Sequence, residues 1–264
     1  MPTPRDIDHI VVMTRDLAAA QAAWSACGFT CTPRAVHPFG TANSLIQLQG
    51  NFVELLEIDD ASRIEEAAGD RFSFAGHNRD FLAQRGEGMS MLVLASGDRD
   101  ADLADWRTQG LRVYEPFDFE RQAKQPDGSS QRVAFSLAFA SEPSLPGLGF
   151  FTCQQHTPEV FWKPDYQVHA NGAQRIASVQ VTGPDPEAAD TFLRAFSGGR
   201  RTTHIALDRD ALTLEEGAPA FPEITIRVAD LDAAAAHLPA ARREADTLVV
   251  PAERLTGVSV RFMR

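Results

Sequence analysis

The sequence predicts an α+β protein made of repeated βαβββ modules, with mixed sheets and with the helices on the outside. Two observations support this fold class. Short apolar segments typical of strands alternate with amphipathic segments typical of helices. The order of strand, helix and further strands recurs four times along the 264 residues. Because the four units differ in length, we expect paired modules whose sheets curve around a cavity, and not a solenoid.

Composition limits the class of protein. A chain of 264 residues is long enough for one large domain or two ordinary ones, and its 44% hydrophobic and 23% charged content is that of a globular protein. The net charge of -11 argues against a phosphate-binding surface, so we expect no nucleic-acid partner. No apolar segment approaches the length of a membrane span, and the N-terminus leads directly into a predicted strand. We therefore expect neither a membrane partner nor a secretory signal.

The three cysteines are Cys27, Cys31 and Cys153. An odd number without CxxC spacing favours free thiols in a reducing compartment, so we expect a cytoplasmic protein. A free cysteine usually behaves as a small buried hydrophobic residue. A catalytic thiol remains the less favoured alternative.

The first module, residues 6–58, begins with an apolar strand at 7–12 that contains His9. An amphipathic helix follows, for which Asp16 is a suitable N-cap and Gly28 a suitable residue just beyond the end. Further strands are predicted at 29–32, 44–48 and 52–56, with a loop at 37–43 and a turn at 49–51.

The second module, residues 88–156, follows a partly helical connector at 59–87. Its predicted strands are 89–95, 111–114, 131–139 and 150–154, with a helix at 100–110 and a turn-rich tip at 122–128. Residues 1–165 would then form one domain.

The third and fourth modules, 174–216 and 221–264, would form a second, shorter domain at 174–264. Their predicted strands are 175–181, 203–207, 211–214, 223–228, 247–250 and 257–262, with helices starting at Asp185 and Asp230.

At this point the sequence resembles the vicinal oxygen chelate superfamily, and within it the glyoxalase-like domain proteins. The resemblance implies modules paired into open half-barrels around a divalent metal. Its members include glyoxalase, extradiol dioxygenases, epimerases and antibiotic-sequestering proteins, so the fold alone does not choose the chemistry. The module pattern covers nearly the whole chain, whereas the motif match is strong only in the first module. The matching segments are Asp8-His9-Ile-Val-Val, Asp16-Leu17-Ala-Ala-Ala, Gly28-Phe29, Gly40-Thr41-Ala-Asn43 and Phe52-Val-Glu54-Leu-Leu.

His9 and Glu54 lie where the superfamily places its metal ligands on the first and last strands of a module. An imidazole and a carboxylate at these positions suit Fe, Mn, Ni or Zn with open coordination positions. The alternative is a hydrogen-bonded core pair, because either side chain is expensive to bury without a partner.

The second module should supply two more ligands, but Met91 lies at the position that matches His9 and cannot replace it at a hard-metal site. The last strand has no acid. By strand alternation, Thr152, Gln154 and His156 share one face. We take His156 as the candidate third metal ligand and Gln154 as a candidate substrate-binding residue.

Three further residues are candidates for binding substrate. His37 and Asn43 flank the Gly40-Thr41 turn beside the expected cavity, although the turn could equally use its Asn and Thr to bind its own backbone. Arg132, on a predicted central strand, could pair with a substrate carboxylate or could face outward.

The resemblance and these residues together favour a metal-dependent enzyme that acts on a small oxygenated organic molecule by chelating vicinal oxygens. The reaction would be of lyase, isomerase or dioxygenase type, with Glu54 also able to act as a base. Met91 weakens the extradiol dioxygenase version, which needs two histidines and one carboxylate. The alternative is a non-enzymatic protein that binds or sequesters a small molecule. A homodimer through the last two modules is a further hypothesis.

Overall fold

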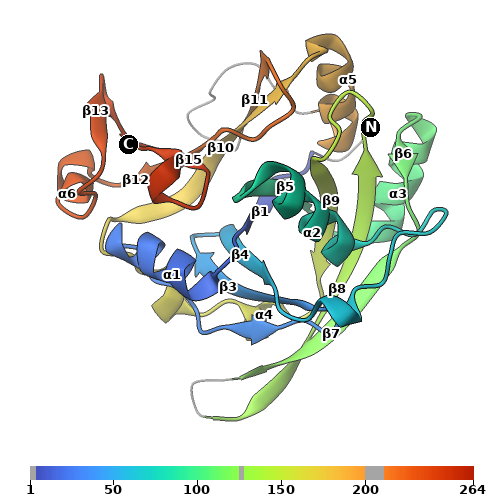
Figure 1. The fold of residues 1–264 in the computed structure, drawn as a ribbon, viewed down its shortest axis with the longest axis horizontal. Coiled ribbons are helices and arrows are strands. Elements are labelled where there is room, and N and C mark those ends of the chain that lie inside the picture. Colours follow the sequence, from blue (N-terminus) through green and yellow to red (C-terminus); the bar gives the residue numbers. More distant parts are fainter. Residues whose placement is uncertain (1–3, 125–127, 200–210) are drawn as a thin grey trace.

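The computed structural model describes residues 4–124, 128–199 and 211–264. In this part of the chain the strands form two mixed sheets, one of nine strands and one of six, with the helices on the outside (Figure 1). The α+β class and the open, paired sheets are therefore confirmed. None of the described helices is long and apolar enough to cross a membrane.

The first module and the connector follow the predicted order. Strand β1 is buried along its whole length, with Asp8 and His9 as its polar residues among apolar ones. Helix α1 begins after Asp16, whose side chain accepts a hydrogen bond from the backbone N–H of Ala19, and buries Leu17, Ala20 and Trp24. The elements are β1 (Ile7–Met13), α1 (Leu17–Ala26), β2 (Ala35–Val36), β3 (Thr41–Gln47), β4 (Phe52–Ile58), the short 3-10 helix η1 (Ala61–Arg63) and α2 (Phe74–Arg85).

The second module repeats this order with one long addition, the hairpin of β7 and β8, which projects from the body of the molecule (Figure 1). Its elements are β5 (Gly88–Ala95), α3 (Arg99–Thr108), β6 (Arg112–Val113), β7 (Phe117–Lys124), β8 (Ser130–Ser141) and β9 (Gly149–Gln155), followed by α4 (Pro158–Phe161) and η2 (Pro164–Gln167).

The last two modules form the six-stranded sheet. Their elements are β10 (Ala173–Gly183), α5 (Pro186–Phe196), β11 (Ala211–Glu216), β12 (Glu223–Val228), α6 (Leu231–Ala235), β13 (Arg242–Glu244), β14 (Thr247–Val250), η3 (Ala252–Arg254) and β15 (Ser259–Met263).

The strand order shows how the modules pair. The large sheet runs β2-β3-β4-β1-β5-β9-β8-β6, with β7 attached to β8. The first strand of each module is parallel to its last strand, and the two first strands, β1 and β5, are antiparallel at the centre. The small sheet, β11-β10-β12-β15-β14-β13, has the same arrangement around β10 and β12. Each sheet is thus one pair of modules.

Four predicted local details differ from the structure. The segment 29–32 is not a regular strand, because Thr32 holds it to β3 partly through its side-chain oxygen, which accepts from the N–H of Leu45. The predicted loop at 37–43 already enters β3 at Thr41, and the predicted tip at 122–128 begins inside β7. Strand β13 was not predicted. The predicted strand at 203–207 lies outside the described residues.

The second sheet is joined to the first by aromatic packing and by buried polar contacts. The ring of Trp106 on α3 stacks on Phe196 of α5, with centroids 5.2 Å apart. Arg5 donates to Asp102 at 2.7 Å and to the carbonyl of Phe196 at 3.0 Å. The side chain of Asn51 donates to the carbonyl of Ile176 and accepts from its N–H, at 3.0 and 2.9 Å. A single hydrophobic core consequently extends through both sheets.

We predict that Asn51→Ala lowers the free energy of unfolding by about 2–4 kcal/mol, because it leaves a buried N–H and a buried C=O of Ile176 without partners. Urea denaturation would measure the change, with the exposed Gln109→Ala as the control. A loss no greater than that of the control would show that water replaces both contacts.

Candidate functional site

A cavity lies on the concave face of the large sheet, and it has a polar end and aromatic walls. A water-sized sphere can reach about 50 Å³ of it, which is room for a few water molecules or a compact ligand. Its polar side chains are His9, His37, Asn43, Glu54 and Arg121. The remaining lining residues are Phe39, Leu45, Phe52, Phe74, Phe119, Phe135, Leu137, Phe151, Cys153 and Phe161.

His9, on β1, is held in one orientation from two sides. Its Nδ1 lies 2.6 Å from the Asp8 carboxylate, whose other oxygen accepts from Gln155 at 2.9 Å. Its ring stacks on Phe52, with centroids 4.3 Å apart and planes 13° from parallel. When the ring N–H at Nδ1 donates to the Asp8 carboxylate, Nε2 is left with its lone pair free to accept a hydrogen bond or a proton. This Nε2 lies 3.7 Å from Oε2 of Glu54.

Glu54, on β4, has its carboxylate fixed between His9 and Asn43. Oε1 accepts a hydrogen bond of 2.6 Å from the amide of Asn43 on β3. Burial raises the pKa of the Glu54 carboxyl, and the negative charge of Asp8 acts in the same direction. The electrostatic influence of His9, the Asn43 hydrogen bond and the positive charge of Arg121 oppose the rise without cancelling it. Glu54 thus holds a proton more readily than an exposed glutamate.

His37 is a neutral member of the site. Its Nδ1 lies 2.8 Å from the hydroxyl of Thr41, and its Nε2 lies 3.2 Å from the amide nitrogen of Asn43. Burial, and then the positive charge of Arg121, lower the pKa of His37 to about 3. His37 and Asn43 line the cavity. The side chains of Thr41 and Asn43 contact the ring of His37, and not their own backbone.

Arg121 completes the polar end, and the sequence analysis did not single it out. It lies on β7, and its Nε is buried with no hydrogen-bond partner among the described residues. Burial lowers the pKa of the guanidinium, and the negative charge of Glu54 opposes this. The signal that could have revealed it is the alternation of Phe117, Phe119 and Arg121 in the segment that leads into the predicted turn-rich tip.

The structure does not bring three of the predicted site residues to the cavity. His156 is exposed, and its Nε2 lies 2.8 Å from the hydroxyl of Ser136. Gln154 donates to the carbonyl of Gly97 at 3.1 Å and accepts from the N–H of Arg99. By strand alternation, both side chains point away from the face of Phe151 and Cys153, which line the cavity.

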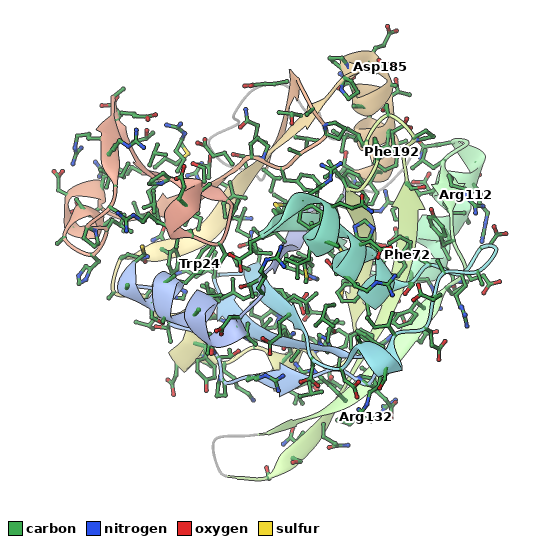
Figure 2. All side chains as sticks on the ribbon, in the orientation of Figure 1. Trp24, Phe72, Arg112, Arg132, Asp185 and Phe192 are labelled. Carbon is green, nitrogen blue, oxygen red and sulfur yellow. The ribbon has the colours of Figure 1, made fainter. Side chains whose placement is uncertain are left out.

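Arg132 is the third. Figure 2 shows it on the projecting hairpin, at the edge of the molecule. It is exposed and pairs with Glu120 of β7, with Nε 2.7 Å from the carboxylate. This is the outward-facing alternative considered for Arg132.

The second module supplies apolar walls where a second pair of ligands was expected. The residues of β9 that face the cavity are Phe151 and Cys153. Met91 is fully buried under α2, with its sulfur 3.4 Å from the amide nitrogen of Asn78. Burial, together with the negative charges of Asp8 and Glu54, raises the pKa of the Cys153 thiol well above its ordinary value. Cys153 is consequently a neutral wall residue, and a nucleophilic thiolate is disfavoured there.

The corresponding positions of the small sheet carry an ion pair. Arg261 on β15 donates to the Glu223 carboxylate on β12 at 2.6 and 3.1 Å, and also reaches Glu244 at 3.2 Å. These groups satisfy one another, which is consistent with a structural role.

The profile of one protein family, described as the Glyoxalase-like domain, matches residues 7–196. The chain belongs to this family. The match covers the complete large sheet and continues through α5. The resemblance to the vicinal oxygen chelate superfamily is thereby confirmed. No curated protein matches the chain.

One solved structure shows the same fold across nearly the whole of this glyoxalase-like protein. A hypothetical protein from Staphylococcus aureus aligns over 98% of each chain, with a TM-score of 0.68 and 15% identity. Methylmalonyl-CoA epimerases from Streptomyces coelicolor and Mycobacterium tuberculosis align over 58% of this chain and over 99% and 88% of their own. Their TM-scores are both 0.39, with 20% and 18% identity.

The donors at the polar end do not fit the divalent metal expected from the fold family. His9 Nε2 and Glu54 could each offer one ligand atom, but Asn43 donates its amide hydrogens towards both Glu54 and His37. Arg121 adds a positive charge beside the same carboxylate. Within the described ranges, no group of three or more His, Cys, Asp and Glu side chains could hold a metal ion. A protein site for these metals normally needs at least three such ligands.

We predict that the protein, purified without chelator, contains well below one divalent transition-metal ion per chain and that EDTA leaves its melting temperature unchanged. Elemental analysis by mass spectrometry and a thermal scan would measure this. A stoichiometric metal that disappears in His9→Ala would contradict the prediction and restore the chelate site.

We also predict that Glu54→Gln stabilises the protein increasingly as the pH rises from 4.5, the ordinary pKa of a glutamate. Because the pKa of Glu54 is raised in the folded chain, the unfolded chain releases this proton first. The wild type therefore loses stability as the pH rises towards the raised pKa, and the glutamine variant escapes this loss. Melting temperatures across pH, with the exposed Glu159→Gln as the control, would measure it. A difference independent of pH would argue against a perturbed carboxyl.

Proposed function

We propose that this glyoxalase-like protein is an enzyme that moves a proton on a small oxygenated organic molecule, with Glu54 as the acid–base group. The observation that supports it is the placement of the Glu54 carboxylate. It is buried at the polar end of an aromatic cavity, fixed by Asn43 at 2.6 Å and facing the acceptor nitrogen of His9 at 3.7 Å. A carboxyl with a raised pKa is suited to exchange protons near neutral pH.

The neighbours of Glu54 give each partner a role in the proposed proton transfer. With Nδ1 donating to Asp8, the Nε2 of His9 can receive a proton from Glu54 and return it. Glu54 would remove a proton from a carbon next to a carbonyl, and the negative charge would pass to the carbonyl oxygen. Return of the proton to a different position gives an isomer, and loss of a leaving group gives a lyase reaction. Neither outcome needs an oxidant.

The ligand set favours isomerase or lyase chemistry over ring-opening dioxygenation. A dioxygenase of the extradiol kind uses two histidines and one carboxylate around iron. Here His156 lies outside the cavity, and the nitrogen of His37 that faces Glu54 is within hydrogen-bonding distance of Asn43.

A second candidate function is binding or sequestering without turnover. The predominance of phenylalanines in the cavity wall favours it, because an apolar ligand could bind there with no chemistry. The two candidates differ in what they predict for the protons of the ligand.

We predict that the enzyme accelerates deuterium uptake from heavy water into the acidic C–H positions of a neutral probe, hydroxyacetone, or an anionic probe, 2-oxobutyrate. Glu54→Gln should slow this exchange by about 100-fold or more, because it removes the group that carries the proton. Proton NMR would follow the reaction, with Glu159→Gln as the control.

Exchange that is unchanged in Glu54→Gln would exclude Glu54 as the acid–base group. Saturable binding of both probes with no exchange in the wild type would favour the sequestering protein.

A further inference from the structure

The guanidinium of Arg121 is the one cationic group among the described residues that line the cavity. It comes from β7 of the second module, across the cavity from the strands that carry His9 and Glu54. Phe119 precedes it on the same face of β7 and makes edge contact with His37, with centroids 5.8 Å apart. A charged side chain among aromatic rings is costly unless a partner of opposite charge completes it.

The groups that face Arg121 do not supply that partner. Its Nε has no acceptor among the described residues. No carboxylate of these residues forms an ion pair with its guanidinium within 4.0 Å, and Glu54 lies near His9 and His37 instead. Glu54 acts on it only through charge at longer range. Both oxygens of the Asp8 carboxylate are occupied, one by Nδ1 of His9 and the other by the amide of Gln155. His37 is neutral.

A second unsatisfied atom lies in the same wall. Oδ1 of Asn43 is buried with no hydrogen-bond partner among the described residues, although its amide nitrogen is fully used. The cavity therefore offers one cationic donor and one neutral acceptor. A buried polar group without a partner calls for a ligand or a water that supplies one.

We infer that Arg121 binds the carboxylate of the ligand and that Asn43 accepts a hydrogen bond from a neighbouring hydroxyl, so that the ligand is a compact 2-hydroxycarboxylate or the enol of a 2-oxo acid. The small space and the phenylalanine walls limit the rest of the ligand to a short apolar body. The inference rests on the proposed function for the location of the site. Its test measures binding alone and can succeed or fail independently of turnover.

The test compares three probes that differ by one group: 2-hydroxyisovalerate, its amide, and isovalerate, which lacks the hydroxyl. Calorimetric titration of the wild type should show the carboxylate binding about 10- to 100-fold more tightly than the amide, the range for a hydrogen bond to a charged group. Isovalerate should bind about 2- to 10-fold more weakly than 2-hydroxyisovalerate, the range for a neutral hydrogen bond.

Variants at two arginines on the same hairpin identify which one causes the preference. Arg121→Met should abolish the preference for the carboxylate over the amide, and Arg121→Lys should keep part of it. Arg132→Met is the matched control, because Arg132 lies on the neighbouring strand, is exposed and pairs with Glu120, and this variant should keep the full preference. If Arg121→Met does not fold, the comparison of carboxylate and amide binding by the wild type and by Arg121→Lys still tests the inference.

Equal binding of the carboxylate and the amide by the wild type would overturn the inference, as would equal losses in Arg121→Met and Arg132→Met. Absence of carboxylate binding at millimolar concentration would also overturn it. The variant Glu54→Gln separates the two proposals. Because it removes a negative charge from the cavity, it should bind the carboxylate at least as tightly as the wild type. This result is expected whether or not the variant loses proton exchange. Arg121-dependent binding without exchange would leave this inference standing and remove the proposed function.

Discussion

The pairing of β1 with β4 on one side and β5 on the other is the constraint on which the site depends. β1 is parallel to β4 with His9 opposite Phe52, and antiparallel to β5 with His9 opposite Val93. Every residue of β1 is buried, so a slip of one residue would turn His9 away from the cavity and place its polar ring in the packing on the other face. This register places His9 beside Phe52 and two residues from the level of Glu54, and at the same time joins the first module to the second.

The same pairing explains why some site residues could be predicted from the sequence and others could not. His9 and Glu54 interrupt apolar strands at the two ends of one module, and parallel pairing of its first and last strands brings them together. His37 and Asn43 flank a short turn between neighbouring strands, so their proximity is nearly local. These four residues could be singled out from the apolar strands, the turn and the resemblance to the superfamily together. The fold class follows from the same repeat.

Residues of the second module were harder to predict because two ambiguities coincide there. In β9 the apolar residues Phe150 and Phe151 are adjacent, so the sequence does not show which face of the strand lines the cavity. Gln154 and His156 were therefore expected on the cavity face, which Phe151 and Cys153 occupy instead. The structure resolves it, since Leu137 of β8 lies opposite Cys153. Strand β7 was not predicted because its alternation of phenylalanines with polar residues is short and continues directly into the turn-rich tip. Arg121 was missed for that reason.

The two modules share one fold but contribute different groups to the cavity. The first supplies the carboxylate, its amide donor and the oriented imidazole, and the second supplies aromatic walls and a single cation. A cation placed opposite a buried carboxylate competes with a metal ion for the same negative charge, and it also lowers the cost of burying that charge. The small sheet illustrates the alternative, because its Arg261 lies within 3.1 Å of both oxygens of Glu223 and the pair is closed. In the large sheet the charges of Glu54 and Arg121 are held apart, with Asn43 occupying the carboxylate and the Nε of Arg121 left without an acceptor. An open pair of this kind is costly to the fold, and a ligand that enters between the two groups recovers that cost on binding.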